Sequence, residues 1–463
     1  MKYVDLFAGC GGLSLGIERA GGELVVAVEK SDMAARTFRH NLIGDASDPA
    51  DWERYAAAPV TEQVQAGLVV RELSALLSDD EAMEGLAAEK LDLVVGGPPC
   101  QGFSLAGRRN PDDVRNKLPW EYLQFVERTG PKAVVIENVV GMNRRFGNEE
   151  ESSFLQLQQA LAETEPGYVV QGVHVNAMHY GAPQHRPRLM IIALRSDIAA
   201  ERNITSTGLL WRSDFTDVMQ TPLAPLAPVP TVSRGDLRTV ADAIADLSPH
   251  GDRTGTGNAR YLGELRQDAW NSRHGSTDRL LNHVPRKHQP RTKNRFRLYQ
   301  YLAGCGQDQR IVSRVADLSA SDARLLVKTR LAESDLPAVS PDETVIATTL
   351  EELTDFVLSL ATRKHSQKVL SWDQPARTVV TLPDDYVHPA EPRIFTVREL
   401  ARFQGFPEGF EFLGKETTGA HRRRLEVPQY SQVGNAVSPW LSWAVGKRIS
   451  EIVGGQETHE GSE

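Results

Sequence analysis

Short apolar runs, separated by stretches long enough for a helix, mark the first 195 residues of the chain. The runs cover residues 3–8, 24–28, 68–70, 91–95 and 133–136, and two more, at 169–175 and 189–194, extend the series. Continuous apolar runs are typical of strands buried on both faces, and helical crossovers between them are typical of parallel sheets. The pattern therefore predicts an α/β domain whose parallel sheet is covered by helices on both faces.

The composition of the sequence changes after residue 195. Residues 222–230, PLAPLAPVP, indicate a stiff proline-rich spacer, and the sequence beyond it is polar, basic and loop-rich. Apolar positions with helical spacing return at 397–403 and 437–449. We therefore expect three segments: a first domain at 1–195, a second, smaller domain at 196–390, and a C-terminal segment at 391–463 that returns to the first domain.

Composition indicates a globular protein, because 40% of the 463 residues are hydrophobic and 24% are charged. The N-terminal apolar run meets Asp5 and then glycines, so it lacks the uncharged core of a signal peptide. We expect no membrane segment and a location in the cytosol or nucleoid of a prokaryote. Three cysteines, Cys10, Cys100 and Cys305, are too few for a disulfide framework or a structural zinc site. We expect no metal.

The net charge of −9 alone argues against a nucleic-acid partner, since phosphates attract positive charge. The distribution of charge changes this reading. Residues 286–297, RKHQPRTKNRFR, hold six Lys or Arg and no acid, and residues 421–424 form a second basic group. A basic run is more often a solvated face than a binding site. Here His283, Phe296 and Tyr299 lie in or beside the run, which favours binding.

A glycine-rich turn follows the first apolar run, in DLFAGCGGLSLG at residues 5–16. Such a turn lets a ligand approach the backbone at a helix N-terminus, and Glu29 stands 20 residues beyond Gly9, where an acid can bind ribose hydroxyls. Ser14 replaces the third glycine of a dinucleotide fingerprint. Nicotinamide binding is therefore disfavoured, whereas another adenosine-containing ligand fits.

A single cysteine stands in a rigid frame in GGPPCQGFS, residues 96–104, directly after an apolar run. A thiol at the carboxyl end of a strand in a parallel sheet faces the ligand-binding crevice, which favours Cys100 as a nucleophile. The alternative is a buried structural cysteine, but Pro98 and Pro99 are poor choices for packing alone. Residues 104–118, punctuated by Gly and Pro and basic in part, are typical of a mobile lid over a polyanion.

Two further groups lie where the same crevice is expected. Glu137 ends the run at 133–136, and a carboxylate there is a candidate general acid. The segment QHRPR precedes the run at 189–194 and brings Arg186 and Arg188, whose guanidinium groups can bind a polar ring or a phosphate through paired hydrogen bonds.

Six motifs in this order, DLFAGCGG, GGPPCQGFS, ENV, QHRPR, TVRELARFQGFP and QVGNAV, closely resemble the DNA (cytosine-5)-methyltransferase family. The resemblance covers residues 5–195 and 392–449 and leaves out roughly 196–370, where that family varies with its target sequence. It implies a Rossmann-like catalytic domain that depends on S-adenosylmethionine, with S-adenosylhomocysteine as product. It also implies a smaller target-recognition domain across a cleft.

The resemblance assigns chemical roles to the residues already singled out. Cys100 would add to carbon 6 of a cytosine flipped out of the duplex, and Glu137 would relieve the charge that builds on the ring. Arg188, with Arg186 behind it, would hold the ring carbonyl and the loop. The resemblance also implies a set of donor-binding residues: Phe7, Gly9, Gly11, Glu29, Pro99, Leu118 and Asn435.

Two acids are candidates for binding the adenine amino group: Glu72, which fits best, and Asp45. Lys30 stands where the family often has an aromatic or apolar residue, which puts the second face of the adenine pocket in doubt. DNA contacts are expected from two groups of residues: Gln101, Ser104, Arg108 and Arg109, and then Arg286, Lys287, Arg291 and Lys293.

The expected partner is double-stranded DNA, bound by a monomer that works beside a cognate restriction or defence system. Three alternatives remain. An RNA cytosine methyltransferase would keep the same catalytic residues, but about 200 residues separate Arg188 from the TVREL motif, room for a DNA-reading domain. An inactive DNA-binding relative would be expected to lack Cys100 or Glu137. A nicotinamide dehydrogenase has no use for GGPPCQ. The target sequence depends on which side chains reach base edges, and no motif predicts it.

Overall fold

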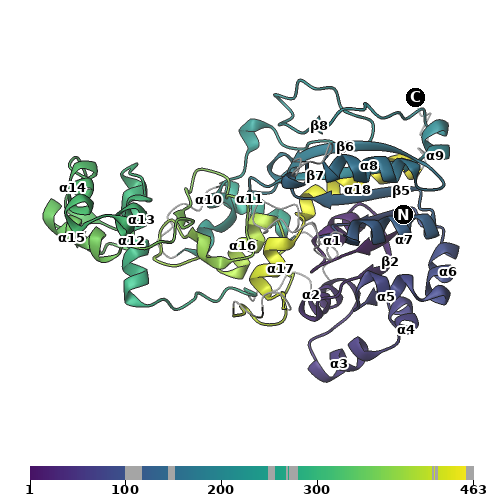
Figure 1. The fold of residues 1–463 in the computed structure, drawn as a ribbon, viewed down its shortest axis with the longest axis horizontal. Helices are drawn as coiled ribbons and strands as arrows, with labels where there is room; N and C mark the ends of the chain where they lie inside the picture. Colours follow the sequence, from purple (N-terminus) through teal and green to yellow (C-terminus); the bar gives the residue numbers. More distant parts are fainter. Residues whose placement is uncertain are drawn as a thin grey trace.

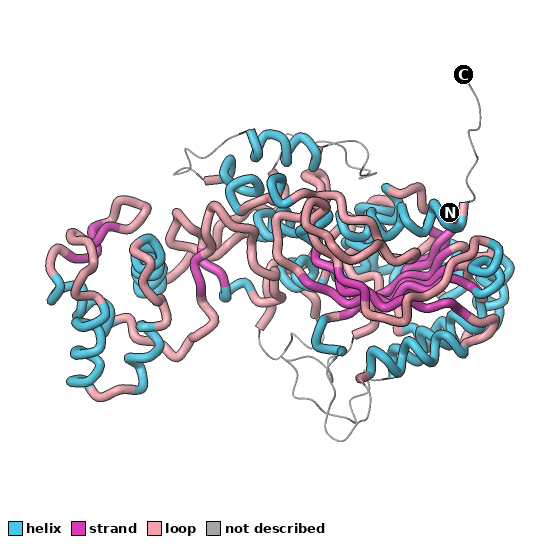
Figure 2. Tube along the Cα trace, turned by 90° about the horizontal axis from the view of Figure 1, so that it is seen from above, coloured by secondary structure: helices cyan, strands magenta, loops and turns pink. Residues whose placement is uncertain are grey.

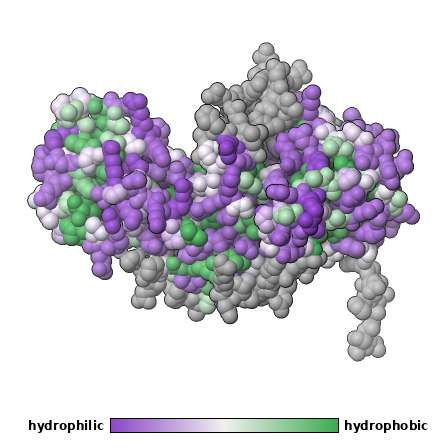
Figure 3. Space-filling model, turned by 90° about the horizontal axis from the view of Figure 1, so that it is seen from below, coloured by the Kyte–Doolittle hydropathy of each residue, from purple (hydrophilic) through white to green (hydrophobic). Residues whose placement is uncertain are grey.

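The computed structural model describes residues 1–99, 117–143, 152–248, 256–266, 270, 280–419, 422 and 426–454. It is an elongated molecule with a sheet-containing body at one end and a helical lobe at the other (Figure 1). Hydrophilic side chains cover most of the outer surface of both parts on the face shown in Figure 3.

One sheet of eight strands, in the order β3, β2, β1, β4, β5, β7, β6, β8, forms the centre of the body. Strands β1 to β5 pair in parallel, as the apolar runs predicted. Strand β7 runs antiparallel to both β5 and β6, which corrects the prediction of a wholly parallel sheet. The connection from β6 to β7 is too short for the helical crossover that parallel neighbours need. The strands are Lys2–Leu6 (β1), Glu23–Val28 (β2), Leu68–Val69 (β3), Leu93–Gly96 (β4), Ala133–Asn138 (β5), Tyr168–Asn176 (β6), Pro187–Arg195 (β7) and Trp211–Arg212 (β8).

Helices cover both faces of the sheet (Figure 2), and alternating side chains along the strands build a separate core on each face. In β1, Val4 joins the core under α5, α6 and α7, whereas Tyr3 joins the core under α1 and α18. The close approach of α1 and α18 needs glycine, because a Cβ on Gly16 would lie 2.4 Å from the carbonyl oxygen of Pro439. The C-terminal helix thus packs beside the first helix. These helices span Gly12–Arg19 (α1), Leu73–Leu77 (α5), Asp80–Ala88 (α6), Leu118–Thr129 (α7) and Pro439–Val453 (α18).

The proline-rich segment 222–230 packs on the sheet-containing body and is not the spacer that its composition indicated. Leu226 and its alanine neighbours are buried in the same core as α18, and Trp211 Nε1 donates to the carbonyl oxygen of Pro222 at 3.1 Å. Tyr180 and Arg448 also donate to carbonyl oxygens of this segment. Together with β8, it carries the body past the boundary expected at residue 195.

The lobe at the far end has a core of its own, in which α12, α13, α14 and α15 surround Tyr299, Val327 and Val357. Its sequence was expected to be loop-rich. The region has many charged residues, and they obscure the helical spacing of its apolar positions in the sequence. The buried side chains show that these positions pack against one another in the core of the lobe. The lobe contains Pro290–Gly304 (α12), Ile311–Arg314 (α13), Ala320–Arg330 (α14), Leu350–Ser359 (α15) and an antiparallel pair of short strands, Ala338–Val339 (β9) and Val345–Ala347 (β10). Two short parallel strands, Lys368–Val369 (β11) and Tyr386–Val387 (β12), follow.

Between the sheet and the lobe in Figure 1 lie the helices Val240–Ile244 (α10), Thr256–Leu265 (α11), Val397–Gln404 (α16) and Gln429–Asn435 (α17). The remaining α-helices are Asp32–Phe38 (α2), Pro49–Ala57 (α3), Val60–Gln65 (α4), Ser153–Glu163 (α8) and Ser196–Glu201 (α9). No helix within the described residues is long and apolar enough to span a membrane.

Candidate active site

The antiparallel pairing of β5 and β7 brings Glu137 and Arg188 together. Glu137 lies opposite Met190, two residues from Arg188, and the Arg188 Nε atom is 2.7 Å from Glu137 Oε1. Both side chains are nearly buried, with 12% and 11% of their surface exposed. Burial lowers the pKa of Arg188, and the neighbouring carboxylate opposes that shift. The structure therefore forms a paired carboxylate and guanidinium at the carboxyl end of β5.

The described part of the cysteine frame, residues 96–99, lies against Glu137 of this pair. A Cβ on Gly97 would stand 3.1 Å from Glu137 Oε2, so glycine leaves room for the carboxylate there. Asn138 Nδ2 donates to the carbonyl oxygen of Pro98 at 3.0 Å, which fixes the frame against β5. Cys100 itself lies outside the described residues, as do four of the predicted DNA contacts: Gln101, Ser104, Arg108 and Arg109.

Arg186 is fully buried and binds backbone carbonyl groups. Its guanidinium donates to the oxygens of Val379 at 3.0 Å, Gly434 at 2.8 Å and Ala436 at 2.9 Å. Burial lowers the pKa of Arg186, and the nearby charge of Arg188 adds to this. Arg186 thus ties the start of β7 to the QVGNAV motif and to the backbone at Val379.

Sequence analysis missed the side chains that complete this connection. Gln184 is fully buried, its Nε2 donates to Gln404 Oε1 at 3.0 Å, and its Oε1 accepts from the Val379 amide at 2.8 Å. Thr378 Oγ1 donates to the carbonyl oxygen of His185 at 2.8 Å. Gln184 could have been noted from its place in QHRPR, whereas no motif signalled Thr378.

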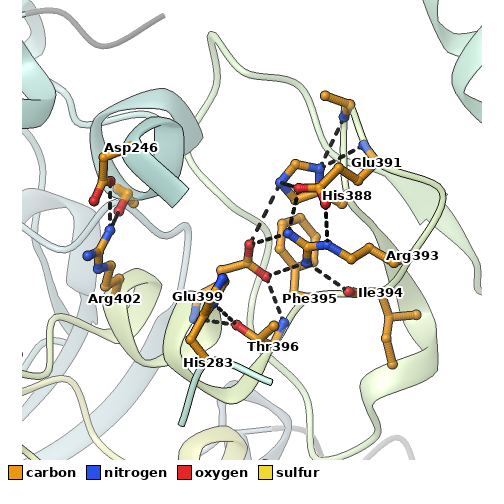
Figure 4. Close-up of polar contacts among 12 residues, drawn as sticks. Asp246, His283, His388, Glu391, Arg393, Ile394, Phe395, Thr396, Glu399 and Arg402 are labelled. Carbon is orange, nitrogen blue, oxygen red and sulfur yellow. Dashed lines mark hydrogen bonds and ion pairs between the residues drawn. The ribbon is translucent and has the colours of Figure 1, made fainter. Parts of the chain in front are cut away.

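The TVREL motif forms α16 and anchors that helix through buried ion pairs (Figure 4). Arg393 donates to both carboxylate oxygens of Glu399 at 2.8 Å, and the Thr396 side chain caps the helix. Burial alone would raise the pKa of Glu399, but Arg393 and the neighbouring His388 lower it to about 2. The motif therefore holds α16 against the segment that leads to the lobe.

The glycine turn after β1 forms a cradle around Glu29. The Gly9 amide donates to Glu29 Oε2 at 2.9 Å, and the Ser31 amide donates to Oε1 at 2.6 Å. Gly9 has a φ of 59°, and an added Cβ would meet no atom within 4 Å. Phe7 also has a positive φ, 62°, a strained conformation for a residue with a Cβ. Open space, an oriented carboxylate and a strained aromatic residue fit an adenosine-containing ligand.

Gly11, unlike Gly9, is closely surrounded by other side chains. Its φ is 99°, and an added Cβ would stand 2.6 Å from Leu42 Cδ1 and 3.0 Å from Phe38 Cδ2. The missing side chain of Gly11 is therefore explained by packing, and its contact with the donor stays a prediction.

Of the two acids proposed for the adenine amino group, Glu72 pairs with the residue that follows Glu29. The Glu29 amide donates to the carbonyl oxygen of Val69 at 3.0 Å, and Lys30 Nζ is 3.2 Å from Glu72 Oε1. Asp45 instead accepts from the Ser47 amide and hydroxyl and pairs with His40; these hydrogen bonds, led by the Ser47 amide, lower the pKa of Asp45. This geometry favours Glu72.

The other expected donor residues lie at the ends of elements. Pro99 closes the described part of the cysteine frame, Leu118 begins α7, and Asn435 is an exposed residue at the end of α17 between two carbonyl groups that bind Arg186. In the part of the chain that the structure describes, no group of three or more His, Cys, Asp or Glu side chains could hold a metal ion.

The basic run 286–297 divides into outward and inward cations. Lys287, Arg291 and Lys293 are exposed, whereas Arg286 is half-buried. Arg297 pairs with Asp342 inside the lobe at 2.8 Å. Of these cations, the exposed Lys287, Arg291 and Lys293 are the ones that can contact a ligand.

Comparisons with known proteins identify the class. Residues 1–54 and 77–451 match the family described as C-5 cytosine-specific DNA methylase, and the chain belongs to this family. It is a DNA cytosine-5 methyltransferase, as the six motifs indicated. The family implies S-adenosylmethionine as the methyl donor.

Relatives match over nearly the whole chain. The Type II methyltransferase M.DdeI of Desulfomicrobium norvegicum is 28% identical over 97% of this chain and 88% of its own length. M.AgeI of Thalassovita gelatinovora is 28% identical over 98% of this chain and 100% of its own. A solved structure, described as a DNA modification methyltransferase encoded within an E. coli prophage, superposes with a TM-score of 0.52 at 20% identity and covers 98% of this chain and 100% of that one. This likeness confirms the α/β fold.

Proposed function

We propose that the chain methylates carbon 5 of a cytosine that is flipped out of a specific duplex site, with Cys100 as a covalent nucleophile. The observation that carries this proposal is the Glu137–Arg188 pair, which lies against the described start of the cysteine frame at Gly97. A thiol one residue beyond Pro99 would follow directly from that frame.

The thiolate addresses the weak nucleophilicity of cytosine carbon 5. The Cys100 sulfur forms a bond to carbon 6, which shifts electron density through the ring to carbon 5. Once carbon 5 carries the methyl group, it gives its proton to water. The electron pair of that C–H bond re-forms the carbon 5–carbon 6 double bond, the carbon–sulfur bond breaks, and the thiolate leaves. The sulfur is thus regenerated with no net oxidation or reduction.

Glu137 and Arg188 stabilise the ring while the thiolate is attached. Glu137, as a carboxylic acid or by sharing a proton with ring nitrogen 3, relieves the negative charge that the addition creates. Arg188 pairs with Glu137 at 2.7 Å and donates toward the ring carbonyl. The Arg186 guanidinium donates to three backbone carbonyl oxygens, and Arg186 is a positioning residue behind this pair.

The cradle around Glu29 holds the donor in this proposal. Glu29 accepts from the ribose hydroxyls, Gly9 leaves space for the methionine part, and Phe7 lies against the adenine. Glu72 takes the adenine amino group, and Pro99, Leu118 and Asn435 line the remaining wall. Bound there, S-adenosylmethionine supplies an electrophilic methyl group.

In this proposal the chain is divided into a catalytic domain and a target-recognition domain, which together bind duplex DNA. We assign residues 1–195 and 391–463 to the catalytic domain, extend it to include β8 and residues 222–230, and assign the rest of 196–390 to target recognition. Flipping a base costs a few kcal/mol, which contacts from the recognition domain offset. The predicted lid lies outside the described residues except at its end, where Leu118 begins α7. The Type II names of the relatives support a role beside a cognate restriction nuclease.

The test is methyl transfer from labelled S-adenosylmethionine to mixed-sequence duplex DNA and, separately, to transfer RNA. We expect label in cytosine carbon 5 of the duplex alone. Label in the RNA alone would support the RNA-methyltransferase alternative, and a protein that binds the duplex without labelling it would support an inactive relative.

A further inference from the structure

A second basic segment lies beside the run 286–297 in the fold. Residues 362–368 read TRKHSQK, with Arg363, Lys364 and Lys368 and no acid. The segment follows α15 directly and leads into β11. No sequence pattern associates the two segments, because the helical lobe separates them along the chain.

Side-chain contacts bring the two segments together. Arg291 Nη2 donates to the carbonyl oxygen of Ser359, the last residue of α15, at 3.0 Å. Lys364 Nζ lies 3.6 Å from Asp384 Oδ2, and Gln367 Nε2 donates to the backbone oxygen of the same residue at 3.1 Å. The charge of Asp384 also acts on His288 in the first segment, where it opposes burial and then Arg286, which lower the pKa of His288. The hydrogen bond from Arg291 to Ser359 therefore places the first segment against the end of α15, three residues before the second segment begins.

Two of the three cations of the second segment point outward, and the third, Lys368, is half-buried. The side chains of Arg363 and Lys364 are 81% and 53% exposed. The acids that contact them, Asp317 and Asp384, are also exposed. Exposed ion pairs contribute little free energy, so these cations can exchange a carboxylate for a phosphate at small cost.

A chain of contacts links the second segment to the active-site strand. Lys368 begins β11, which pairs in parallel with β12 from Tyr386. The Tyr386 hydroxyl donates to the carbonyl oxygen of Thr378 at 3.1 Å, and Thr378 Oγ1 donates to His185 in the QHRPR motif. The basic surface is therefore held in a defined relation to Arg188.

We propose that residues 362–368 and 286–293 form one phosphate-binding track, which holds the duplex that flanks the target cytosine. The inference rests on the proposed function, in which the substrate is duplex DNA. The track contacts the sugar-phosphate backbone and contributes affinity for any sequence, while target discrimination comes from elsewhere.

The test compares two triple variants that remove the same charge from the same lobe. The first is Arg363→Gln, Lys364→Gln and Lys368→Gln. The control is Arg324→Gln, Lys328→Gln and Arg330→Gln on α14, where Arg324 contacts Glu351 and Asp355 and Lys328 contacts Glu351. Both are titrated with a long duplex across a range of salt, and thermal unfolding checks that each variant is folded.

For the first variant, we expect log affinity to fall less steeply with log salt, by about 0.9 for each lost phosphate contact and thus by about two to three in all. The change should be equal for target and non-target duplexes and should vanish for a short duplex trimmed close to the target cytosine. The control should keep the wild-type slope.

A folded first variant whose slope matches the control would show that residues 362–368 are only a solvated face. A loss of discrimination between duplexes without a change of slope would also overturn the track, because it would indicate base reading. Methyl transfer is also measured at low salt with saturating DNA, which distinguishes failure of the phosphate-binding track from failure of the proposed function. An active enzyme with an unchanged slope rejects the track alone, whereas wild-type protein that methylates no duplex rejects the proposed function.

Discussion

At the scale of single residues, the groups proposed for the chemistry are held by more partners than their motifs revealed. Glu137 and Arg188 could be selected from ENV and QHRPR, but their contact could not, since it depends on the register of β5 and β7. The three carbonyl partners of Arg186 lie roughly 190 to 250 positions away along the chain. Such distant contacts leave no local pattern in a sequence.

Replacing Glu137 with glutamine tests its role as a proton donor. Glu137→Gln keeps an oxygen for Arg188 but cannot supply the proton, so we expect the methyl-transfer rate to fall by about 10²- to 10⁴-fold while the Kd for DNA changes little. Single-turnover kinetics and a binding titration measure the two effects separately. If only the affinity changed, the proposed role in the reaction would be wrong.

Asp5 provides a test of pH dependence. It is fully buried in β1 and accepts from Ser14 Oγ at 2.7 Å, and its Oδ1 has no hydrogen-bond partner within the described structure. Burial raises the pKa of Asp5 from 3.8 to about 7, although the Ser14 hydrogen bond opposes the shift. The folded state therefore holds an extra proton between about pH 4 and pH 7, so stability should fall as the pH rises through this window.

The variant Asp5→Asn should remove that fall, which between pH 5 and pH 8 is at most about 3 kcal/mol. Urea unfolding at pH 5 and pH 8 measures it, with the exposed substitution Glu84→Gln as control. An equal loss of stability from pH 5 to pH 8 in wild type and Asp5→Asn would assign the pH dependence to other groups.

At the scale of elements, apolar runs predicted the strands well because each is buried on both faces. The antiparallel direction of β7 was not predictable from its composition, because an apolar run has the same pattern in either direction. Helices α12 to α15 were missed for a different reason. Their many charged residues dominate the sequence, and the few apolar positions acquire meaning only from the core that they share.

The packing of α1 against α18 provides a test at this scale. A Cβ at Gly16 would lie 2.4 Å from Pro439 O and from Ser442 Cβ, so we expect Gly16→Ala to destabilise the protein by about 1–3 kcal/mol. Gly85 in α6 is a matched control, because an added Cβ there meets nothing within 4 Å. Gly85→Ala should be neutral or stabilising by about 0.5–1 kcal/mol. Urea unfolding compares the two, and equal stabilities would contradict the close approach of the helices.

At the scale of the whole molecule, an acidic protein must bind an acidic polymer. The net charge of −9 makes local basic surfaces necessary, and the exposed Lys287 and Lys293 belong to one. Replacing both lysines with alanine should weaken binding to all duplexes equally and reduce the salt dependence by about one unit for each lost contact. Salt titrations with target and non-target duplexes measure this. An unchanged slope and an unchanged affinity would mean that these lysines are only solvated.

The central claim is that this chain methylates cytosine in DNA through Cys100. Bisulfite sequencing of the genome of a host without cytosine methylation, expressing either the wild-type chain or Cys100→Ser, tests it most directly. We predict that the wild type protects cytosines within one recurrent sequence, which would also identify the target, and that Cys100→Ser protects none, because a hydroxyl is a far weaker nucleophile near neutral pH. No protected cytosine with the wild type, or the same protection with Cys100→Ser, would contradict the account.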